Sequence, residues 1–125
     1  MTTSTDVPSI AAQVHALVAR LSVAEKLGQM MQPERQVTTP ADVATYHLGS
    51  ILSGGGSAPG GNRPADWIAM NDAYWAASMR TDNGRTAIPL LYGVDAIHGH
   101  ANVFGATVFP HNIGLGAAND ADLMV

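Results

Sequence analysis

An aspartate and three histidines stand close together in the second half of the sequence and could bind a ligand. Asp95 ends an apolar segment, His98 and His100 follow it, and His111 stands further on. A carboxylate at the end of a strand could hydrogen-bond a polar ligand, and together with a His-X-His pair it could bind zinc. Two simpler readings stay open, because Asp95 could cap backbone amides and the histidines could hydrogen-bond the loop. We expect no metal here, since the spacing suits the simpler reading of the histidines.

A glycine-rich loop, Gly54–Gly61, lies between an expected strand and an expected helix, where phosphate-binding loops occur. It contains no Gly-Lys-Ser/Thr, and its glycines do not match G-x-G-x-x-G. We therefore expect a loop that needs positive φ angles or close backbone packing, with no nucleotide and no other cofactor.

Three aromatic residues follow that loop at helical spacing, namely Trp67, Tyr74 and Trp75. Aromatic rings can stack on sugars, but this spacing is more typical of a helix face packed in the core. The chain contains no G-x-S-x-G element, so serine hydrolase chemistry has no support.

The first third of the chain predicts three helices. Apolar residues recur at helical spacing from Ile10 to Leu21. Ser22-Val23-Ala24-Glu25 is a capping box that begins a second helix. Thr39 followed by Pro40 predicts a third, short helix that ends near His47, because proline suits the first helical turn.

The rest of the chain alternates between strands and helices. Leu48–Ser53 and Ile88–Val94 predict strands, separated by a helix that begins at Asn62 or Pro64 and is broken at Asp82–Gly84. The unbroken apolar run of the second strand is typical of a parallel strand covered on both faces. A loop follows, and Ile113–Ala118 is a candidate third strand. This order predicts an α/β fold with a parallel sheet.

The chain ends soon after the start of a further expected helix. Asn119 or Asp120 caps it, and only residues 121–125 follow, which is little more than one turn. Because so short a helix does not sustain itself, we expect the chain to stop within an element.

The composition excludes several classes of protein. The 125 residues carry a net charge of −4 with no basic stripe, so we expect no nucleic acid and no membrane among the partners. The charged fraction of 13% is about half the usual share and suits a chain buried in a larger body, or a small domain with an apolar surface. The absence of cysteine excludes disulfides and thiolate metal sites. Residues 1–8 form a polar leader without a signal-peptide pattern, so a cytoplasmic location is the default, with a periplasmic or secreted parent left open.

Four stretches of the sequence resemble glycoside hydrolase family 3, in its β-glucosidase and β-glucan exohydrolase branch. They are Leu21–Met30 (LSVAEKLGQM), Tyr46–Ser57 (YHLGSILSGGGS), Gly93–His100 (GVDAIHGH) and Gly105–Ala117 (GATVFPHNIGLGA). The likeness runs from about Leu21 to the end of the chain, with the motifs in the expected order.

This resemblance implies a fold and an activity. Residues 9–125 would be the N-terminal portion of a (β/α)8 TIM-like barrel, about three strands of it and incomplete in this chain, usually followed by an α/β sandwich domain. The family removes glucose or related sugars from the non-reducing ends of β-glucosides and β-glucans, with retention of configuration. Asp95 would bind sugar hydroxyls in subsite −1. The nucleophile, a Lys-His pair and the acid/base glutamate would lie downstream, so this chain would hold no catalytic residue.

Other readings of the chain remain open. It could be a small nucleotide-binding domain using Gly54–Gly61, a metal module using Asp95, His98 and His100, or a binding-only barrel fragment without hydrolase activity. A closed barrel takes about 250 residues, so the isolated chain would expose apolar faces and we expect it to fold marginally or aggregate.

Overall fold

The computed structural model describes residues 8–82 and 84–124. The expected polar leader, residues 1–8, lies outside this range except for Pro8, which is exposed. The order of elements is α1 (Ile10–Arg20), α2 (Val23–Gln29), the 3₁₀ helix η1 (Arg35–Val37), α3 (Pro40–Tyr46), β1 (Ser50–Ser53), α4 (Pro64–Ser78), β2 (Leu91–Val94), α5 (Asn112–Ala118) and the 3₁₀ helix η2 (Ala121–Met124).

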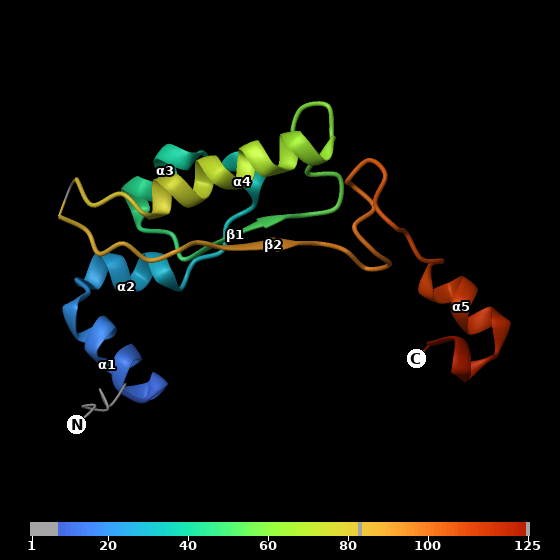
Figure 1. The fold of residues 1–125 in the computed structure, drawn as a ribbon, viewed down its shortest axis with the longest axis horizontal. Helices are drawn as coiled ribbons and strands as arrows, with labels where there is room; N and C mark the ends of the chain where they lie inside the picture. Colours follow the sequence, from blue (N-terminus) through green and yellow to red (C-terminus); the bar gives the residue numbers. More distant parts are fainter. Residues whose placement is uncertain (1–7, 83, 125) are drawn as a thin grey trace, which may run out of the picture.

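The centre of the fold is a β1–α4–β2 unit. The two strands pair in parallel with Ser50 opposite Leu91 and Ser53 opposite Val94. Helices α3 and α4 lie on one face of this pair, and α2 lies near its beginning (Figure 1). The predicted α/β architecture with a parallel sheet is confirmed for the part of the chain that the structure covers.

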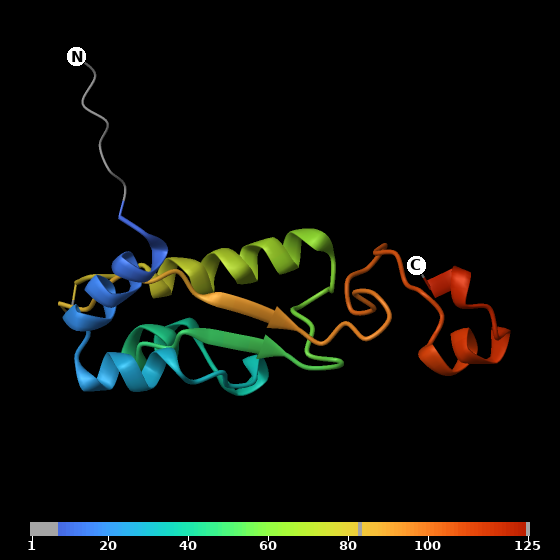
Figure 2. The ribbon, with the colours of Figure 1, turned by 90° about the horizontal axis from the view of Figure 1, so that it is seen from below.

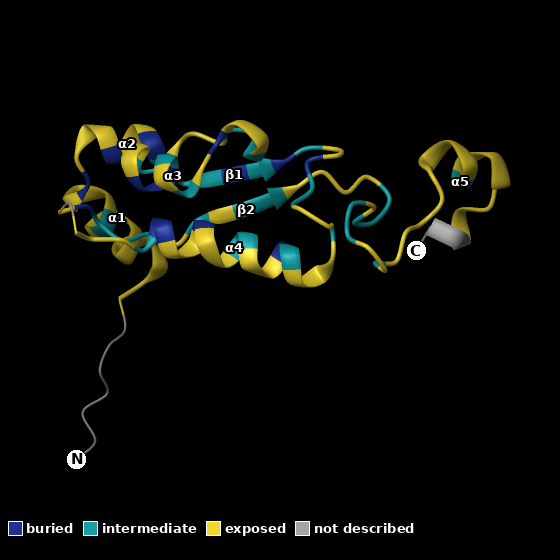
Figure 3. Ribbon diagram, turned by 90° about the horizontal axis from the view of Figure 1, so that it is seen from above, coloured by how far each residue is buried: buried dark blue, intermediate teal, exposed yellow. Residues whose placement is uncertain are grey.

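The core lies between the sheet and the two helices that cover it. Its buried residues are Val43, Ala44, Leu48, Ile51, Tyr74 and Ala77, with Met70, Leu90 and Tyr92 packed against them. Ile51 and Val43 are fully buried because β1 lies directly beneath α3 and α4. Figure 3 shows that the buried positions gather in this region, whereas the C-terminal segment with α5 extends away from it and is largely exposed.

The expected third strand at Ile113–Ala118 is wrong, because this segment forms helix α5 and only two strands pair within the described residues. A short apolar run does not by itself distinguish a strand from a helix. Ala117 and Ala118 favour a helix, and the segment has one β-branched residue, Ile113. Asn119 then ends the helix in the left-handed region with φ 49°. The helix expected after Asn119 or Asp120 is a 3₁₀ turn.

Strand β2 is parallel as predicted, but it is not covered on both faces. Leu91 is 69% exposed. Helix α1 likewise leaves Ile10 and Val14 exposed. No helix in residues 8–82 and 84–124 is long and apolar enough to cross a membrane.

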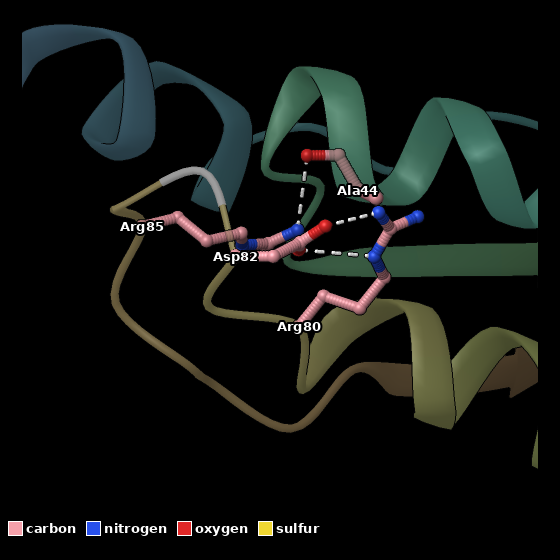
Figure 4. A network of polar contacts seen from close by, with 4 residues as sticks. All are labelled: Ala44, Arg80, Asp82 and Arg85. Atoms are coloured by element: carbon pink, nitrogen blue, oxygen red, sulfur yellow. Dashed lines mark hydrogen bonds and ion pairs between the residues drawn. The ribbon is translucent and has the colours of Figure 1, made fainter.

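Helix α3 is held at both ends. Thr39 and Asp42 form a capping box at its beginning, with Pro40 in the first turn as predicted. At its end, the buried Arg85 donates from Nη1 to the carbonyl oxygens of Val43 (3.2 Å) and Ala44 (3.1 Å). Burial lowers the pKa of Arg85. A cation is favoured at a helix C-terminus, so Arg85 adds charge-assisted hydrogen bonds to the carbonyls of the last turn. Figure 4 shows the bond from Arg85 to Ala44 beside the exposed Arg80–Asp82 ion pair.

The predicted capping box of α2 is confirmed, and its glutamate also bonds a segment outside the helix. Glu25 Oε2 accepts from the Ser22 amide at 2.8 Å, and the Ser22 hydroxyl accepts from the Glu25 amide at 3.2 Å. Glu25 Oε1 accepts from the Thr86 amide at 2.7 Å. One buried carboxylate therefore joins α2 to the segment that leads into β2.

We predict that Glu25→Gln lowers the free energy of unfolding by about 1–2 kcal/mol at pH 7. The Thr86 amide, followed by the Ser22 amide and hydroxyl, lowers the pKa of Glu25 from 4.5 to about 2. A lowered pKa stabilises the fold above about pH 4.5, and this contribution disappears as the pH falls from about 4.5 towards 2. Equilibrium urea unfolding of the full-length gene product at several pH values measures this difference.

The exposed Asp72 of α4 provides a matched control, because Asp72→Asn should leave stability unchanged at every pH. A Glu25→Gln protein as stable as wild type at pH 7 would contradict the prediction. So would a difference that stays constant as the pH is lowered to about 2.5.

Candidate functional site

Asp95 lies at the carboxyl ends of the two strands. Its amide donates to the Ser53 carbonyl at 2.9 Å, which extends the β1–β2 pairing by one bond. The side chain is exposed, and no donor among the described residues hydrogen-bonds its carboxylate. Asp95 therefore does not cap backbone amides, and both its oxygens remain available to a ligand.

A small hollow of about 140 Å³ opens beside this carboxylate. Its walls come from the glycine loop and from the loop after β2, and the residues that line it are Gly55, Asp95, Ile97, His98, Ala101, Asn102 and His111. Ligand pockets usually exceed about 300 Å³, so this hollow has the size of a part of a binding site. Asp95 is the one acidic residue in its wall.

The side chain of His98 is hydrogen-bonded to the backbone of the loop. Its Nδ1 donates to the Phe109 carbonyl at 2.8 Å, and the Phe109 amide donates to the His98 carbonyl at 2.7 Å. The ring centroids of His98 and His111 lie 3.9 Å apart with planes inclined by 39°. The simpler reading, in which a histidine hydrogen-bonds the loop backbone, is confirmed for His98.

His100 points to a different neighbour. Its ring meets Trp67 edge to face, with centroids 4.6 Å apart, and Trp67 Nε1 donates to Asn62 Oδ1 at 2.8 Å. In the described part of the chain, no three His, Asp or Glu side chains come together as a group that could hold a metal ion. The structure thus does not assemble Asp95, His98 and His100 into the metal module considered above.

Gly99 allows the loop after β2 to turn back on itself. Its φ is +102°, and a Cβ there would lie 2.5 Å from the Thr107 carbonyl oxygen. Gly99 pairs with Val108 in an antiparallel bridge, next to the paired His98 and Phe109. A side chain would strain this turn and push the two halves of the loop apart, so glycine is required between the two histidines.

The glycine loop is not arranged to bind a phosphate. The amides of Ser57, Ala58 and Asn62 donate to carbonyls within the loop. At the start of α4, the carboxylate of Asp66 accepts from the Arg63 amide at 2.9 Å. Because a carboxylate already occupies the helix N-terminus, an anionic phosphate would be repelled there. The nucleotide-binding reading therefore has no structural support.

Two of the three aromatic residues pack as predicted. Trp67 is 6% exposed and Tyr74 is 5% exposed, whereas Trp75 is 54% exposed. Tyr74 also donates to the Thr38 carbonyl at 2.6 Å, which explains how its hydroxyl is accommodated in the core. The expectation that all three belong to the core is wrong for Trp75.

Asn62 was expected only as a possible helix start, but α4 begins at Pro64 and Asn62 joins the two loops of the site. It adopts φ 59° and accepts from Trp67 Nε1 through its side chain and from the Phe104 amide, at 2.9 Å, through its carbonyl. Asparagine tolerates the left-handed region, so its place at the end of a glycine loop was the available signal. Its partner Phe104 belongs to the loop after β2, and nothing local in the sequence indicates that contact.

Comparisons with known proteins agree on one relationship. Residues 22–125 match the model of the glycosyl hydrolase family 3 N-terminal domain. The lysosomal β-glucosidase of Dictyostelium discoideum is 32% identical over 83% of this chain. The crystal structure of an exo-1,3/1,4-β-glucanase from a Pseudoalteromonas species superposes with a TM-score of 0.80 and 45% identity over 94% of this chain. A solved variant of that enzyme gives the same TM-score and identity.

The chain is much shorter than these relatives. It spans 14% of the Dictyostelium protein and 15% of the exo-glucanase chain. The family match nevertheless extends from residue 22 to residue 125, and it includes Asp95 and both loops around it. The chain therefore belongs to glycosyl hydrolase family 3.

Proposed function

We propose that residues 9–125 form the first part of a (β/α)8-type barrel in a longer glycoside hydrolase. The family match, the parallel β1–α4–β2 unit and the small share of each relative that the chain spans support this proposal. Leu91 of β2 is exposed, and an isolated pair of strands is only marginally stable, so the remaining strands of a barrel would extend the sheet and cover its open face. The partners of the chain are then the rest of the barrel and a second α/β domain.

The reaction that we propose is removal of terminal β-D-glucosyl residues from β-glucosides or β-glucan oligosaccharides. The activities named for the relatives, a β-glucosidase and an exo-1,3/1,4-β-glucanase, support this substrate class. The single structural observation behind the proposal is the exposed Asp95 carboxylate, which accepts no hydrogen bond from the described residues and borders a hollow at the strand ends. It would accept hydrogen bonds from the hydroxyls of a sugar in subsite −1.

We propose that retention of configuration requires groups from outside residues 1–125. A retaining glycosidase needs two carboxyl groups about 5–5.5 Å apart on either side of the scissile bond. Asp95 is the one acidic residue in the wall of the hollow, so it cannot supply that pair. Its role is to orient the sugar ring, while the nucleophile and the acid/base residue come from later parts of the polypeptide.

Hydrolysis assays on the full-length gene product test this function. We expect release of 4-nitrophenol from 4-nitrophenyl β-D-glucopyranoside and of glucose from β-1,3- and β-1,4-linked gluco-oligosaccharides. Proton NMR of the first product should show β-glucose, as retention requires. Initial α-glucose would contradict the mechanism. A folded product that binds glucose but hydrolyses none of these substrates would support the binding-only reading.

A further inference from the structure

The glycine loop beside Asp95 has few side chains with which to hold its own position. Five of the eight residues from 54 to 61 are glycine. Glycine loses more conformational freedom on ordering than any other residue and offers no side chain for packing. The place of this loop therefore depends on the polar contacts that reach it from outside.

Arg35 supplies two of these contacts. Its Nε donates to Ser57 Oγ at 3.0 Å, and its Nη2 donates to the Ala58 carbonyl at 3.2 Å. Ser57 is 1% exposed, and its amide donates to the Gly54 carbonyl at 3.0 Å. Because the Ser57 hydroxyl is buried, losing the Arg35 donor would leave part of its hydrogen-bonding capacity unmet and out of reach of solvent, which is costly. A charged side chain thus holds the middle of the loop through two bonds.

Arg35 is itself carried on a rigid support. It begins η1, and the chain just before η1 joins the edge of β1 where the Leu52 amide donates to the Pro33 carbonyl at 3.0 Å. Thr38, just after η1, donates to the Glu34 carbonyl, and its own carbonyl accepts from the buried Tyr74 hydroxyl. The guanidinium therefore fixes the glycine loop relative to the sheet and to α4.

The neighbouring carboxylate strengthens this arrangement. Hydrogen bonding by the Ser57 side chain is the largest of the causes that lower the pKa of Glu34, and the Gln36 and Gly54 amides and the charge of Arg35 act in the same direction. Glu34 is thus ionised at neutral pH beside Arg35 and Ser57. The loop is bracketed by a cation and an anion that both approach Ser57.

The glycine loop lies against Asp95, the residue that we propose binds the sugar. A Cβ built on Gly55 would be 3.8 Å from Asp95 Oδ2, and both residues line the hollow at the strand ends. The loop follows directly from β1, beside strand β2, whose last residue, Val94, precedes Asp95 (Figure 2). A shift of the loop would therefore change the shape of the site next to the carboxylate.

We propose that Arg35, acting through Ser57, is a positioning residue that sets where the glycine loop lies beside Asp95 and so determines the affinity for the sugar. The inference rests on the proposed function. Neither Arg35 nor Ser57 lines the hollow, so their effect would be transmitted through the loop.

The experiment measures kcat and KM of the full-length enzyme on 4-nitrophenyl β-D-glucopyranoside for Ser57→Ala, Arg35→Gln and the double variant. Since a misplacement of about 1 Å can cost up to about 100-fold, we expect KM to rise about tenfold in each single variant. The value of kcat should change less than about threefold, because the loop holds the sugar in ground state and transition state alike. The effect of the double variant should fall short of the product of the two single effects, since both changes break the contact between Arg35 and Ser57.

Two matched controls separate positioning from general loss of structure. Ser50→Ala removes a serine that bonds the Met31 carbonyl at the other end of β1, and Arg80→Gln removes an exposed arginine beyond α4. Both should leave KM unchanged. Arg35→Gln, at the less buried partner, keeps the test decisive if Ser57→Ala does not fold.

The outcomes distinguish the inference from the function on which it rests. A wild-type enzyme that hydrolyses no β-glucoside would overturn the proposed function and this inference with it. An active wild-type enzyme whose folded Ser57→Ala and Arg35→Gln variants keep KM within about twofold would overturn the inference alone. Fully additive effects in the double variant would also contradict it.

Discussion

Replacing Asp95 with alanine should lower kcat/KM on an aryl β-glucoside by at least about 100-fold in the full-length enzyme. A carboxylate that accepts two sugar hydroxyls makes charge-assisted hydrogen bonds, each worth about 1.5–3 kcal/mol. Their loss raises the transition-state free energy by about 3 kcal/mol or more, and each step of about 1.4 kcal/mol is a factor of ten. Steady-state kinetics with 4-nitrophenyl β-D-glucopyranoside measures the effect.

The Asp95→Ala substitution should change binding without changing the stability of the fold. The Asp95 side chain is exposed and receives no hydrogen bond from the described residues, so its removal should not destabilise the fold. Asp72→Ala, at an exposed position of α4, is the matched control and should keep wild-type kinetics. A kcat/KM of Asp95→Ala within a few fold of the wild-type value would show that Asp95 does not bind the sugar.

Replacing Gly28 with alanine should destabilise the helical layer by about 3 kcal/mol or more. Alanine would otherwise favour helix α2 by about 1 kcal/mol over glycine. Here, however, a Cβ would lie 2.1 Å from the Tyr46 carbonyl oxygen and 2.6 Å from that of His47. Both are backbone atoms, so α2 must move away from the end of α3.

That movement would break the contacts that join α2 to the start of β1. The Gly49 amide donates to the Gly28 carbonyl at 3.0 Å, and Gln29 Nε2 donates to the His47 carbonyl at 2.9 Å. Hydrogen exchange of the full-length protein, read on peptides that span residues 21–52, should show faster exchange in Gly28→Ala.

A second helical glycine, Gly116 of α5, provides the control for Gly28. It has nothing within 4 Å of an added Cβ, so Gly116→Ala should be neutral or stabilising by up to about 1 kcal/mol. Opposite signs for the two substitutions would confirm that close packing, not helix propensity, requires glycine at position 28. Equal protection in Gly28→Ala and wild type would refute the prediction.

Local signals in the sequence predicted most of the elements. The predicted capping box at Ser22 depends on residues three positions apart and is present, and α3 begins after Thr39 with Pro40 in its first turn, as predicted. The β–α–β order from Leu48 to Val94 followed from apolar runs and turn residues, and the strands are parallel as expected. The motifs around Asp95 indicated the family, which the match to residues 22–125 confirms.

Two other features of the elements were not predicted correctly. Ile113–Ala118 was expected to be a strand because a short apolar run has no reliable period, and it forms α5. Trp75 belongs to the same aromatic group as Trp67 and Tyr74, yet it lies on the exposed side of α4.

Hydrogen bonds between segments far apart in the chain could not be predicted from the sequence either. The bond from Arg35 to Ser57 spans 22 residues, and that from Thr86 to Glu25 spans 61. Such pairs are set by how the helices and strands meet. Spacing along the sequence therefore gave no indication of either contact.

The most direct test of the account is a crystal structure of the full-length protein with glucose bound at its site. We expect Asp95 to accept hydrogen bonds of about 2.7 Å from sugar hydroxyls, with the Gly54–Gly61 loop against the same sugar. Glucose bound with Asp95 out of hydrogen-bonding reach would contradict the assignment of Asp95 and of the loop that Arg35 positions.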